Sequence, residues 1–513
     1  MLIKTFGSAV YGINASLITV EVNIGSGFGY DMVGLPDNAV KESRLRIETA
    51  FKNARLSLPR NKVVINMAPA DLKKEGSAYD LTLAAGLLAA TEQIDATELS
   101  EYMIMGELSL DGSILPIKGA LPIAIEAMKS GFKGFILPRE NAKEAAIVKD
   151  LRVYGMDNIA DVVSFFNQTQ VFEPTVSDPR GEFEENVQIF DVDFADVQGQ
   201  ENIKRAMEIA AAGGHNIILI GPPGAGKTML AKRLPTILPP MSLREALETT
   251  KIHSVAGKLG SHASLMASRP FRSPHHTVSD VALVGGGAIP QPGEISLAHN
   301  GVLFLDELPE FKRTVLEVLR QPLEERKISI SRAKLSVAYP SSFMLVASMN
   351  PCPCGYYNHP EKNCVCSTHV VQKYLSKISG PLLDRIDIHI EVTPVSFEQL
   401  AARNHKAESS QVVAERVVKA RKIQEERYQE LPNTHCNAQL HSNQIKAYCT
   451  IPGAGQQLLK TAMERLSLSA RAYDRILKLS RTIADLEESP QIKVEHLAEA
   501  IQYRSLDREN WAG

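Results

Sequence analysis

The sequence of 513 residues lacks several features that mark specialised protein classes. It has one tryptophan and six cysteines, too few cysteines for a disulfide scaffold of the secreted kind. Its longest run of apolar and small residues, LTLAAGLLAA, is about half the length that a membrane-crossing helix needs. The net charge is only −3, so the chain has no overall basic character. Any contact with nucleic acid must therefore come from a local basic patch.

The N-terminal stretch MLIKTFGSAVYGINAS does not have the pattern of a signal peptide, because Gly, Tyr and Asn interrupt its apolar residues. With no membrane span expected either, we expect a cytoplasmic protein. A reducing compartment favours metal binding over disulfide formation where cysteines cluster. The hydrophobic content of 44% and charged content of 22% are those of an ordinary globular protein. The length predicts about two to four domains.

Hydrophobic periodicity divides the chain into three parts. Residues 1–168 alternate strand-like and helix-like runs, which predicts an α/β domain. The stretch 169–189 contains two prolines and no sustained period, so we expect a linker there. A second α/β pattern occupies 190–393, and helical periodicity dominates 394–513. In the first part, strands are expected at 16–25, 61–69, 101–110 and 132–138, and helices at 39–56, 80–91 and 120–131.

A phosphate-binding motif stands in the segment NIILIGPPGAGKTMLAKRL. The pattern G-x-x-x-x-G-K-T lets backbone N–H groups close around phosphate oxygens between a strand and a helix. Lys227 is expected to reach the outer phosphates and Thr228 to bind Mg²⁺. Because the flanking segments have strand and helix patterns, we interpret the motif as a genuine ATP-binding loop rather than a chance match. The loop consists of Gly221, Pro222, Pro223, Gly224, Ala225, Gly226, Lys227 and Thr228.

Polar residues end two further apolar runs. In NGVLFLDELPEF, Asp306 suits the shell of a Mg²⁺ ion, and Glu307 suits the activation of an attacking water. In FMLVASMNP, Asn350 ends the run and is placed to position the water or to sense the γ-phosphate. An acidic strand end alone is unremarkable, but here it follows a phosphate loop. The predicted reaction is Mg²⁺-dependent hydrolysis of ATP.

Two arginines are candidates for completing the site. Arg385 lies in SGPLLDRIDIHIEV between Asp384 and Asp387, and a lone arginine near acids is usually a surface ion pair. Its position after the third strand instead predicts an arginine finger that enters a neighbouring chain's site, worth ~10³–10⁵ in rate. Arg471, in SLSARAYDRILKL, is expected to reach the nucleotide from the helical part. A finger that acts on a neighbour implies a ring of identical chains, and we expect a hexamer.

These motifs together resemble the AAA+ ATPases of the magnesium-chelatase and MCM-helicase clade. The segment RPFRSPHHTVSDVALVGGG (269–287) resembles this clade's insert in the second helix, and RKISISRAKLSVAYPSS (326–342) resembles its hairpin. With GFGYDMVGLPDNAVKESRLRIETAF near the N-terminus, the resemblance spans nearly the whole chain and is close to the ComM/YifB family. It implies an α/β fold with a P-loop AAA+ core at 190–393 and a helical lid at 394–513. It also implies a hexameric DNA helicase that promotes branch migration in homologous recombination and natural transformation.

Two other functions share parts of this pattern. A chelatase motor that drives metal into a tetrapyrrole would have the same core, but it needs a partner subunit, and no porphyrin-directed site is visible. An ATP-dependent peptidase is the other, because residues 106–141 and the segment APADLKKEGSAYDLTLAAGLLAA resemble the Lon peptidase domain. A peptidase of that kind needs a serine nucleophile and a lysine base.

The peptidase dyad is missing at the positions where the resemblance would place it. Leu121 stands at the lysine position and Ala78 at the serine position, with Ser77 one residue away. Lys118, three residues before Leu121, is the remaining substitute. We therefore expect a non-catalytic Lon-peptidase-like N-terminal domain that serves binding or assembly.

Four cysteines lie close together directly after Asn350. They form two C-x-C pairs separated by nine residues, which is similar to a four-thiolate zinc site, although C-x₂-C is the commoner spacing. His359 or His369 is an alternative ligand, and free or redox-active thiols are the alternative to a metal. Cys436 and Cys449 stand alone and are interpreted as structural. The expected Zn²⁺ ligands, in the loop 352–366, are Cys352, Cys354, Cys364 and Cys366.

The predicted hairpin is also the candidate for gripping DNA. Alternating apolar residues predict two short strands, and Arg332 and Lys334 lie at the turn between them. A basic hairpin tip is unremarkable alone, but six such tips in a ring would place about a dozen positive charges around one channel. Arg269 and Arg272 of the insert, with His275 and His276, are the alternative DNA contacts. The expected partner is single-stranded or branched DNA, with no membrane contact.

Overall fold

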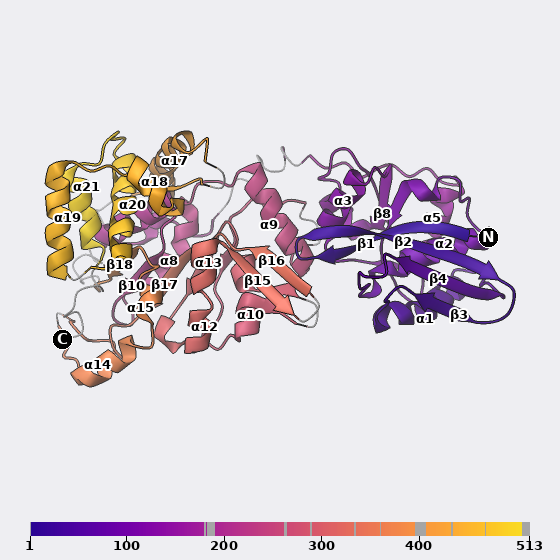
Figure 1. Cartoon of the computed structure of the whole chain (residues 1–513), viewed down its shortest axis with the longest axis horizontal. Helices are drawn as coiled ribbons and strands as arrows, with labels where there is room; N and C mark the ends of the chain where they lie inside the picture. The colour runs from indigo at the N-terminus through magenta and orange to yellow at the C-terminus, as the bar shows by residue number, and fades with distance from the viewer. Residues whose placement is uncertain are drawn as a thin grey trace.

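The structure is a computed structural model of the whole chain. The residues that it describes are 2–178, 181, 190–260, 264–287, 290–332, 335–359, 361–394, 407–431, 434–466 and 468–504. An N-terminal α/β unit lies at one end of an elongated molecule, and the remaining elements lie at the other (Figure 1). No helix among these residues is both long and apolar enough to cross a membrane.

The N-terminal unit is built on a seven-stranded mixed sheet in the order β3-β4-β2-β1-β5-β8-β9. Its strands are β1 (Leu2–Tyr11), β2 (Asn14–Gly25), β3 (Tyr30–Val33), β4 (Lys62–Ala68), β5 (Tyr102–Ile104), β8 (Gly134–Pro138) and β9 (Arg152–Met156), with a separate pair, β6 (Glu107–Leu108) and β7 (Ile114–Leu115). Its helices are α1 (Asn38–Asn53), α2 (Asp80–Ala90), α3 (Ala120–Lys129), α4 (Arg139–Ala145) and α5 (Ile159–Phe166). Nine of the eleven residues of α2 are apolar or glycine, which explains why this helix is buried almost all round.

The predicted helices of this unit are confirmed as α1, α2 and α3, and three predicted strands as β2, β4 and β8. The predicted strand 101–110 is wrong in extent, because it divides into β5 and β6. The break falls at Gly106, where a side chain would lie 2.9 Å from Ile114 and 3.1 Å from Leu81. The chain turns there, so that β6 pairs antiparallel with β7 instead of extending the large sheet.

The second unit contains a five-stranded parallel sheet in the order β11-β14-β17-β10-β18. Its strands are β10 (Ile217–Ile220), β11 (Phe271–Arg272), β14 (Val302–Leu305), β17 (Met344–Met349) and β18 (Ile388–Glu391). The helices around it are α7 (Glu201–Gly213), α8 (Lys227–Arg233), α9 (Leu243–Ala256), α10 (Asp280–Val284), α11 (Glu294–Leu297), α12 (Arg313–Glu317), α13 (Arg320–Glu325), α14 (Thr368–Leu375) and α15 (Gly380–Leu383). Every residue of β10, β14 and β17 is buried, as expected for strands covered on both faces.

Two small hairpins project from this unit. They are β12 (Gly285–Gly286) with β13 (Gln291–Pro292), and β15 (Lys327–Arg332) with β16 (Leu335–Pro340). The predicted basic hairpin is thus confirmed, with Ile330 opposite Val337. Lys334 lies outside the described residues, and Arg332 is described only as the last residue of β15. The hairpin extends toward the N-terminal unit (Figure 1), where a side chain at Gly12 would lie 2.7 Å from Val337.

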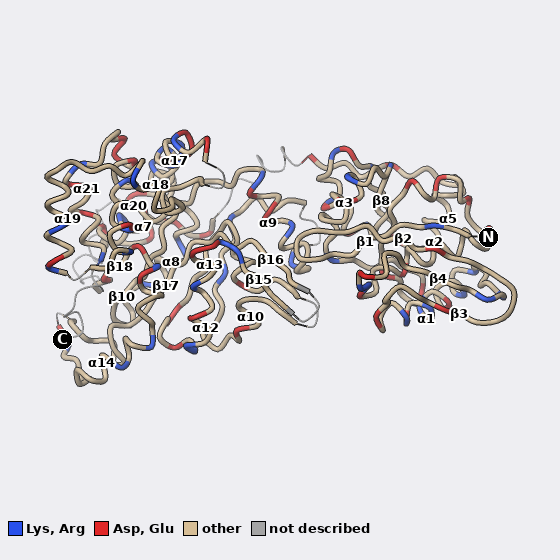
Figure 2. Tube along the Cα trace, viewed as in Figure 1, with Lys and Arg blue, Asp and Glu red and all other residues tan. Residues whose placement is uncertain are grey.

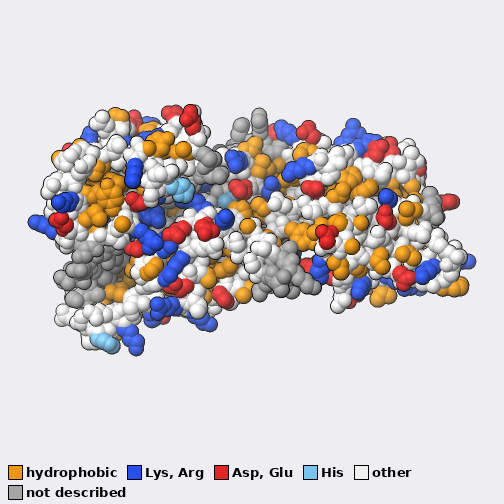
Figure 3. Space-filling view, viewed as in Figure 1, with side chains coloured by type: hydrophobic (Ala, Val, Ile, Leu, Met, Phe, Trp, Pro, Cys, Tyr) orange, Lys and Arg blue, Asp and Glu red, His pale blue; other side chains and the backbone are white. Residues whose placement is uncertain are grey.

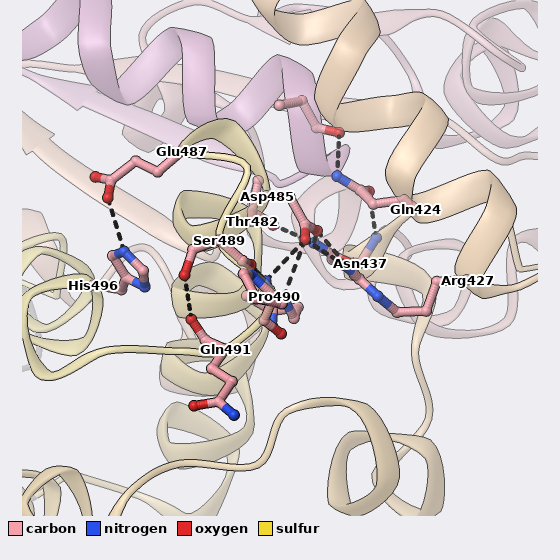
Figure 4. A network of polar contacts seen from close by, with 12 residues as sticks. Gln424, Arg427, Asn437, Thr482, Asp485, Glu487, Ser489, Pro490, Gln491 and His496 are labelled. Atoms are coloured by element: carbon pink, nitrogen blue, oxygen red, sulfur yellow. Dashed lines mark hydrogen bonds and ion pairs between the residues drawn. The ribbon is translucent and has the colours of Figure 1, made fainter.

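The C-terminal part is helical, as predicted. Its helices are α17 (Ser410–Arg427), α18 (Ser442–Tyr448), α19 (Gly453–Leu466), α20 (Ala470–Leu486) and α21 (Val494–Gln502). A buried polar network around Asp485, whose side chain is fully buried, joins α17, α20 and the turn at Asn437 (Figure 4). Asp485 accepts hydrogen bonds from Arg427 at 3.0 Å, Arg481 at 3.1 Å and Asn437 at 2.8 Å. Removing one partner from a buried ion pair costs about 3–5 kcal/mol, so this network fixes α20 against α17.

Candidate functional site

Three neighbouring parallel strands end at one edge of the second sheet; the phosphate-binding loop follows one of them, and a polar residue follows each of the other two. β10 leads to Gly221, β14 to Asp306 and β17 to Asn350. Because parallel strands present their carboxyl ends at the same edge, residues far apart in sequence meet there. The N–H of Gly221 donates to the Met349 carbonyl at 3.1 Å, which joins the first loop directly to the end of β17.

The phosphate-binding loop runs from β10 into α8. Gly224 and Gly226 have φ angles of +80° and +85°, a region that side chains disfavour. Lys227 starts α8, and its ammonium group donates to the carbonyls of Gly221 at 2.7 Å and Pro222 at 2.9 Å. Burial lowers the pKa of Lys227, with the charges of Asp306 and Glu307 opposing that shift. A partly desolvated ammonium inside a loop of backbone N–H groups is a site for an anionic phosphate.

Asn350 is placed at this same ammonium group. Its Oδ1 accepts a hydrogen bond from the Lys227 Nζ at 3.1 Å, across 123 positions of sequence. The structure therefore brings the end of the third strand within hydrogen-bond reach of the phosphate-binding lysine. The predicted role of Asn350, to position the water or to sense the γ-phosphate, stays a prediction.

Thr228 and Asp306 form the second contact of the site. The Thr228 hydroxyl donates to the Asp306 Oδ2 at 2.8 Å. Two oxygen ligands on adjacent corners of a Mg²⁺ octahedron lie about 3 Å apart, so this hydroxyl and this carboxylate fit one Mg²⁺ ion. Ser348 donates to the other Asp306 oxygen and fixes the carboxylate. Sequence reasoning missed Ser348; its only signal is a hydroxyl two residues before Asn350 in an apolar strand.

Glu307 occupies an unusual backbone conformation beside Asp306. Its φ is +54°, and its N–H donates to the Asp306 Oδ1 at 3.1 Å. The side chain is 57% exposed, and its Oε2 lies 3.8 Å from the Nδ1 of His276. A positive φ is uncommon for a residue other than glycine, so the surroundings hold Glu307 in a conformation that it would seldom adopt alone. The contact with His276 was not predicted, because the insert that carries this histidine approaches only in the folded chain.

Arg385 makes its polar contacts away from the phosphate loop. Its side chain is 8% exposed, pairs with Glu324 at 2.6 Å and donates to the Pro381 carbonyl at 2.5 Å. Its Nε is buried and lacks a hydrogen-bond partner in the described part of the chain. An arginine finger at this position would therefore have to exchange Glu324 for the phosphate of a neighbouring chain.

The lid helix α20 is bound to the segment that carries Arg385. Arg475 lies 3.0 Å from the buried Asp387, and Arg471 lies 3.7 Å from Asp384. Burial alone would raise the pKa of Asp387, but Arg475 and His215 hold it far below its usual range. Arg471 itself is 56% exposed, and its described ion pair is with Asp384 rather than with the phosphate loop. Its predicted contact with nucleotide stays a prediction.

Arg269 and Arg272 form ion pairs with acidic residues of the same chain. Arg269 pairs with Glu245 at 3.3 Å and donates to the Asn300 carbonyl at 2.7 Å. Arg272 forms a two-pronged pair with Glu294, at 2.6 and 2.8 Å. These contacts fasten the insert to the core, so the prediction that both arginines contact DNA gains no support from their placement.

The four predicted zinc ligands come together. Their sulfur atoms all lie within 4.8 Å of one another, and neither His359 nor His369 belongs to this group. His359 instead accepts hydrogen bonds from the backbone of Glu361 at 3.0 Å and Lys362 at 3.1 Å. Cys436 and Cys449 are buried elsewhere, as expected for structural residues.

The peptidase positions do not form a dyad. The Leu121 side chain is fully buried in the N-terminal core. Ser77, Ala78 and Lys118 line one cavity of about 860 Å³ between the N-terminal unit and the core, but the Ser77 hydroxyl donates to Glu107. A serine bonded to a carboxylate, without a lysine at the expected position, lacks the base that the Lon-type reaction uses.

Three protein families match consecutive parts of the chain. "Magnesium chelatase, subunit ChlI" matches residues 193–400, "Subunit ChlI of Mg-chelatase" matches 20–141, and "Magnesium chelatase, subunit ChlI C-terminal" matches 407–504. The chain is 44% identical to competence protein ComM of Haemophilus influenzae, over 98% of this chain and 97% of that protein. It is also 44% identical to the uncharacterised protein YifB of Salmonella typhimurium, over 98% and 96%. A shorter match, 32% identical over 28% of this chain and 27% of that protein, is to Lon protease 2 of Bacillus subtilis.

Replacing Glu307 by Gln should separate ATP binding from ATP hydrolysis. The change removes the carboxylate that would activate water and leaves Lys227, Thr228 and Asp306 in place. We expect the ATP affinity to stay close to that of the unchanged protein. We expect the turnover rate to fall by at least about a hundredfold. Glu310→Gln is the matched control, because Glu310 is exposed and pairs with Lys377 at 3.4 Å. Equal turnover in the two variants would show that Glu307 has no catalytic role.

Proposed function

Because this chain belongs to the ComM/YifB family of magnesium-chelatase-like AAA+ ATPases, we propose that it is an ATP-driven motor that moves along DNA. The observation that supports the proposal is a pair of hydrogen bonds: Lys227 donates to Asn350, and Thr228 donates to Asp306. These two contacts assemble the groups needed for the phosphates and for Mg²⁺ at one sheet edge. Bound Mg²⁺ would neutralise charge that develops on the phosphate oxygens.

Each chain supplies most of one hydrolytic site. Lys227 would hold the outer phosphates, while Thr228 and Asp306 would bind the metal. Glu307, with its exposed carboxylate, would orient and deprotonate the attacking water. Asn350 would exchange its contact with Lys227 for the γ-phosphate and the water, and so report whether ATP or ADP is bound.

Arg385 would complete the site of a neighbouring chain, which requires a ring. It lies on the turn between α15 and β18, and α20 clamps this turn through Arg475 and Asp387. A finger held by the lid would move with the lid when nucleotide is bound or released. We therefore propose a homo-hexamer in which hydrolysis in one chain changes the conformation of the next chain through Arg385.

DNA is the proposed substrate of the movement. The relative from Haemophilus influenzae is named a competence protein, and we propose the same setting for this chain: branch migration during DNA uptake and recombination. Lys and Arg are interspersed with Asp and Glu along the molecule (Figure 2), and the face in Figure 3 carries both signs side by side. The DNA-binding site must therefore be a local one, and six copies of the β15–β16 hairpin would form it.

A chelatase motor is the second candidate, because the matching families are described as magnesium-chelatase subunits. Such a motor would act on a partner that holds the tetrapyrrole. The near full-length likeness to the competence protein favours the DNA motor, since that likeness includes the N-terminal unit and the cysteine loop.

Mixing two inactive variants tests the action of Arg385 on a neighbour. Arg385→Ala and Lys227→Ala should each be inactive alone, and mixed rings should regain part of the ATPase rate. One interface then combines an intact phosphate loop with an intact finger. The matched control mixes Lys227→Ala with Glu307→Gln: both residues serve the same chain's site, so no activity should return. If mixed rings are shown to form and stay inactive at every ratio, Arg385 does not act in trans.

Removing the hairpin charges tests where DNA is bound. Arg332→Ala with Lys334→Ala should weaken binding to single-stranded DNA at least about tenfold and flatten its salt dependence. ATP hydrolysis without DNA should be unchanged, because neither residue belongs to the nucleotide site. The control is Lys422→Ala with Arg465→Ala, which removes equal charge from exposed lid positions. DNA binding that matches the control variant would exclude the hairpin as the grip.

A further inference from the structure

The four clustered cysteines form a compact group with a buried member. Cys352 is fully buried, while the other three are partly exposed. The Cys352 sulfur lies 3.3 Å from that of Cys354 and 3.7 Å from that of Cys364, and Cys354 lies 3.5 Å from Cys364. The backbone N–H of Cys366 donates to the Cys364 sulfur at 3.4 Å. Four sulfur atoms that face one another, one of which accepts an N–H bond, fit the arrangement of ligands around a single cation.

The spacing of the sulfur atoms fits a single ion in a tetrahedral site. Four thiolates at the usual Zn–S distance of about 2.3 Å, in a tetrahedron, lie about 3.8 Å from one another. The three separations among Cys352, Cys354 and Cys364, which are 3.3–3.7 Å, are close to that value, and all four sulfur atoms lie within 4.8 Å of one another. A disulfide would need about 2.05 Å, and all four cysteines are free. An iron–sulfur cluster would hold the thiolates farther apart, because several iron atoms stand between them.

The cysteine group rests directly on the phosphate-binding loop. Gly355, which follows Cys354, has a φ of +83°, and its N–H donates to the Cys352 carbonyl at 3.0 Å. A Cβ atom at Gly355 would lie only 2.5 Å from the Cδ of Pro223. The tight turn over residues 352–355, which contains the first two cysteines, therefore packs its backbone against a residue of the phosphate-binding loop.

The same group fixes the end of β17. Cys352 follows Asn350 by two residues, so the first sulfur ligand holds the chain directly after the carboxamide that contacts Lys227. The turn thus contacts the nucleotide site from two directions, through Pro223 and through Asn350. Without a central cation, four sulfur atoms at this spacing have little to hold them together, since the loop around them is largely polar and exposed.

We propose that the four cysteines bind one Zn²⁺ ion as thiolates and that this zinc knot holds the phosphate-binding loop in its nucleotide-binding shape. The metal is structural, because all four of its positions are filled by protein sulfur. The coupling to nucleotide rests on the proposed ATPase function, whereas the zinc site does not. Losing the ion releases the turn at Gly355, and Pro223 then loses its support.

Elemental analysis tests the metal site independently of activity. The protein purified without added metal should contain about one zinc per chain and no stoichiometric iron. Cys354→Ser with Cys364→Ser should lose that zinc, whereas Cys436→Ser with Cys449→Ser should keep it. If the first variant does not fold, release of Zn²⁺ from the unchanged protein by a mercurial, measured with a chromogenic dye, gives the same count. Iron in place of zinc, no metal, or zinc retained without the two thiols would overturn the site.

A glycine substitution tests the coupling while all four thiols remain. Gly355→Ala should keep its zinc but bind Mg²⁺–ATP at least about tenfold more weakly, because the new methyl group pushes Pro223 out of place. Gly131→Ala is the matched control: its φ is +79°, and nothing lies within 4 Å of the added atom. Equal ATP affinity in the two variants would overturn the coupling and leave the zinc site standing. An unchanged protein that holds zinc but binds no ATP would instead refute the proposed function.

Discussion

The parallel pairing of β14, β17 and β10 is the constraint on which the rest of the site depends. All three strands are buried on both faces, so their register is fixed by packing and not only by backbone hydrogen bonds. Because the register is fixed, the residues after each strand meet at one edge within hydrogen-bond distance. A slip of one residue in β17 would exchange Asn350 for Met349 at Lys227 and would remove Ser348 from Asp306.

This edge also links nucleotide to the rest of the chain. On one side the cysteine turn packs against the phosphate loop at Pro223. On another, α20 clamps the turn that carries Arg385, and the network around Asp485 holds α20 against α17. If this edge binds nucleotide as proposed, a change of nucleotide would act on elements with few alternative positions, which would favour discrete states over gradual deformation. In the proposed ring, Arg385 would have to leave its ion pair with Glu324 to reach a neighbouring chain.

The sequence was most informative where function requires a fixed local pattern. The phosphate loop, Asp306 and Asn350 could be placed at one edge because a motif and two strand ends predict it. The contacts that Ser348, His276 and Glu324 make could not be predicted, because they join segments distant in sequence. Arg269 and Arg272 show the converse failure: basic residues in an insert predict a nucleic-acid contact, but in the folded chain both pair with partly buried acidic residues. The division of β5 from β6 at Gly106 was missed for a similar reason, since tertiary packing overrides strand propensity.

The central claim is that ATP hydrolysis in this chain is coupled to DNA. The most direct measurement is the steady-state ATPase rate with no DNA, with single-stranded DNA and with a branched four-way junction, at one protein concentration and one salt concentration. The account predicts a rate several-fold higher with saturating DNA, and greatest with the form on which the motor moves. An ATPase rate that is substantial but identical in all three conditions would contradict it.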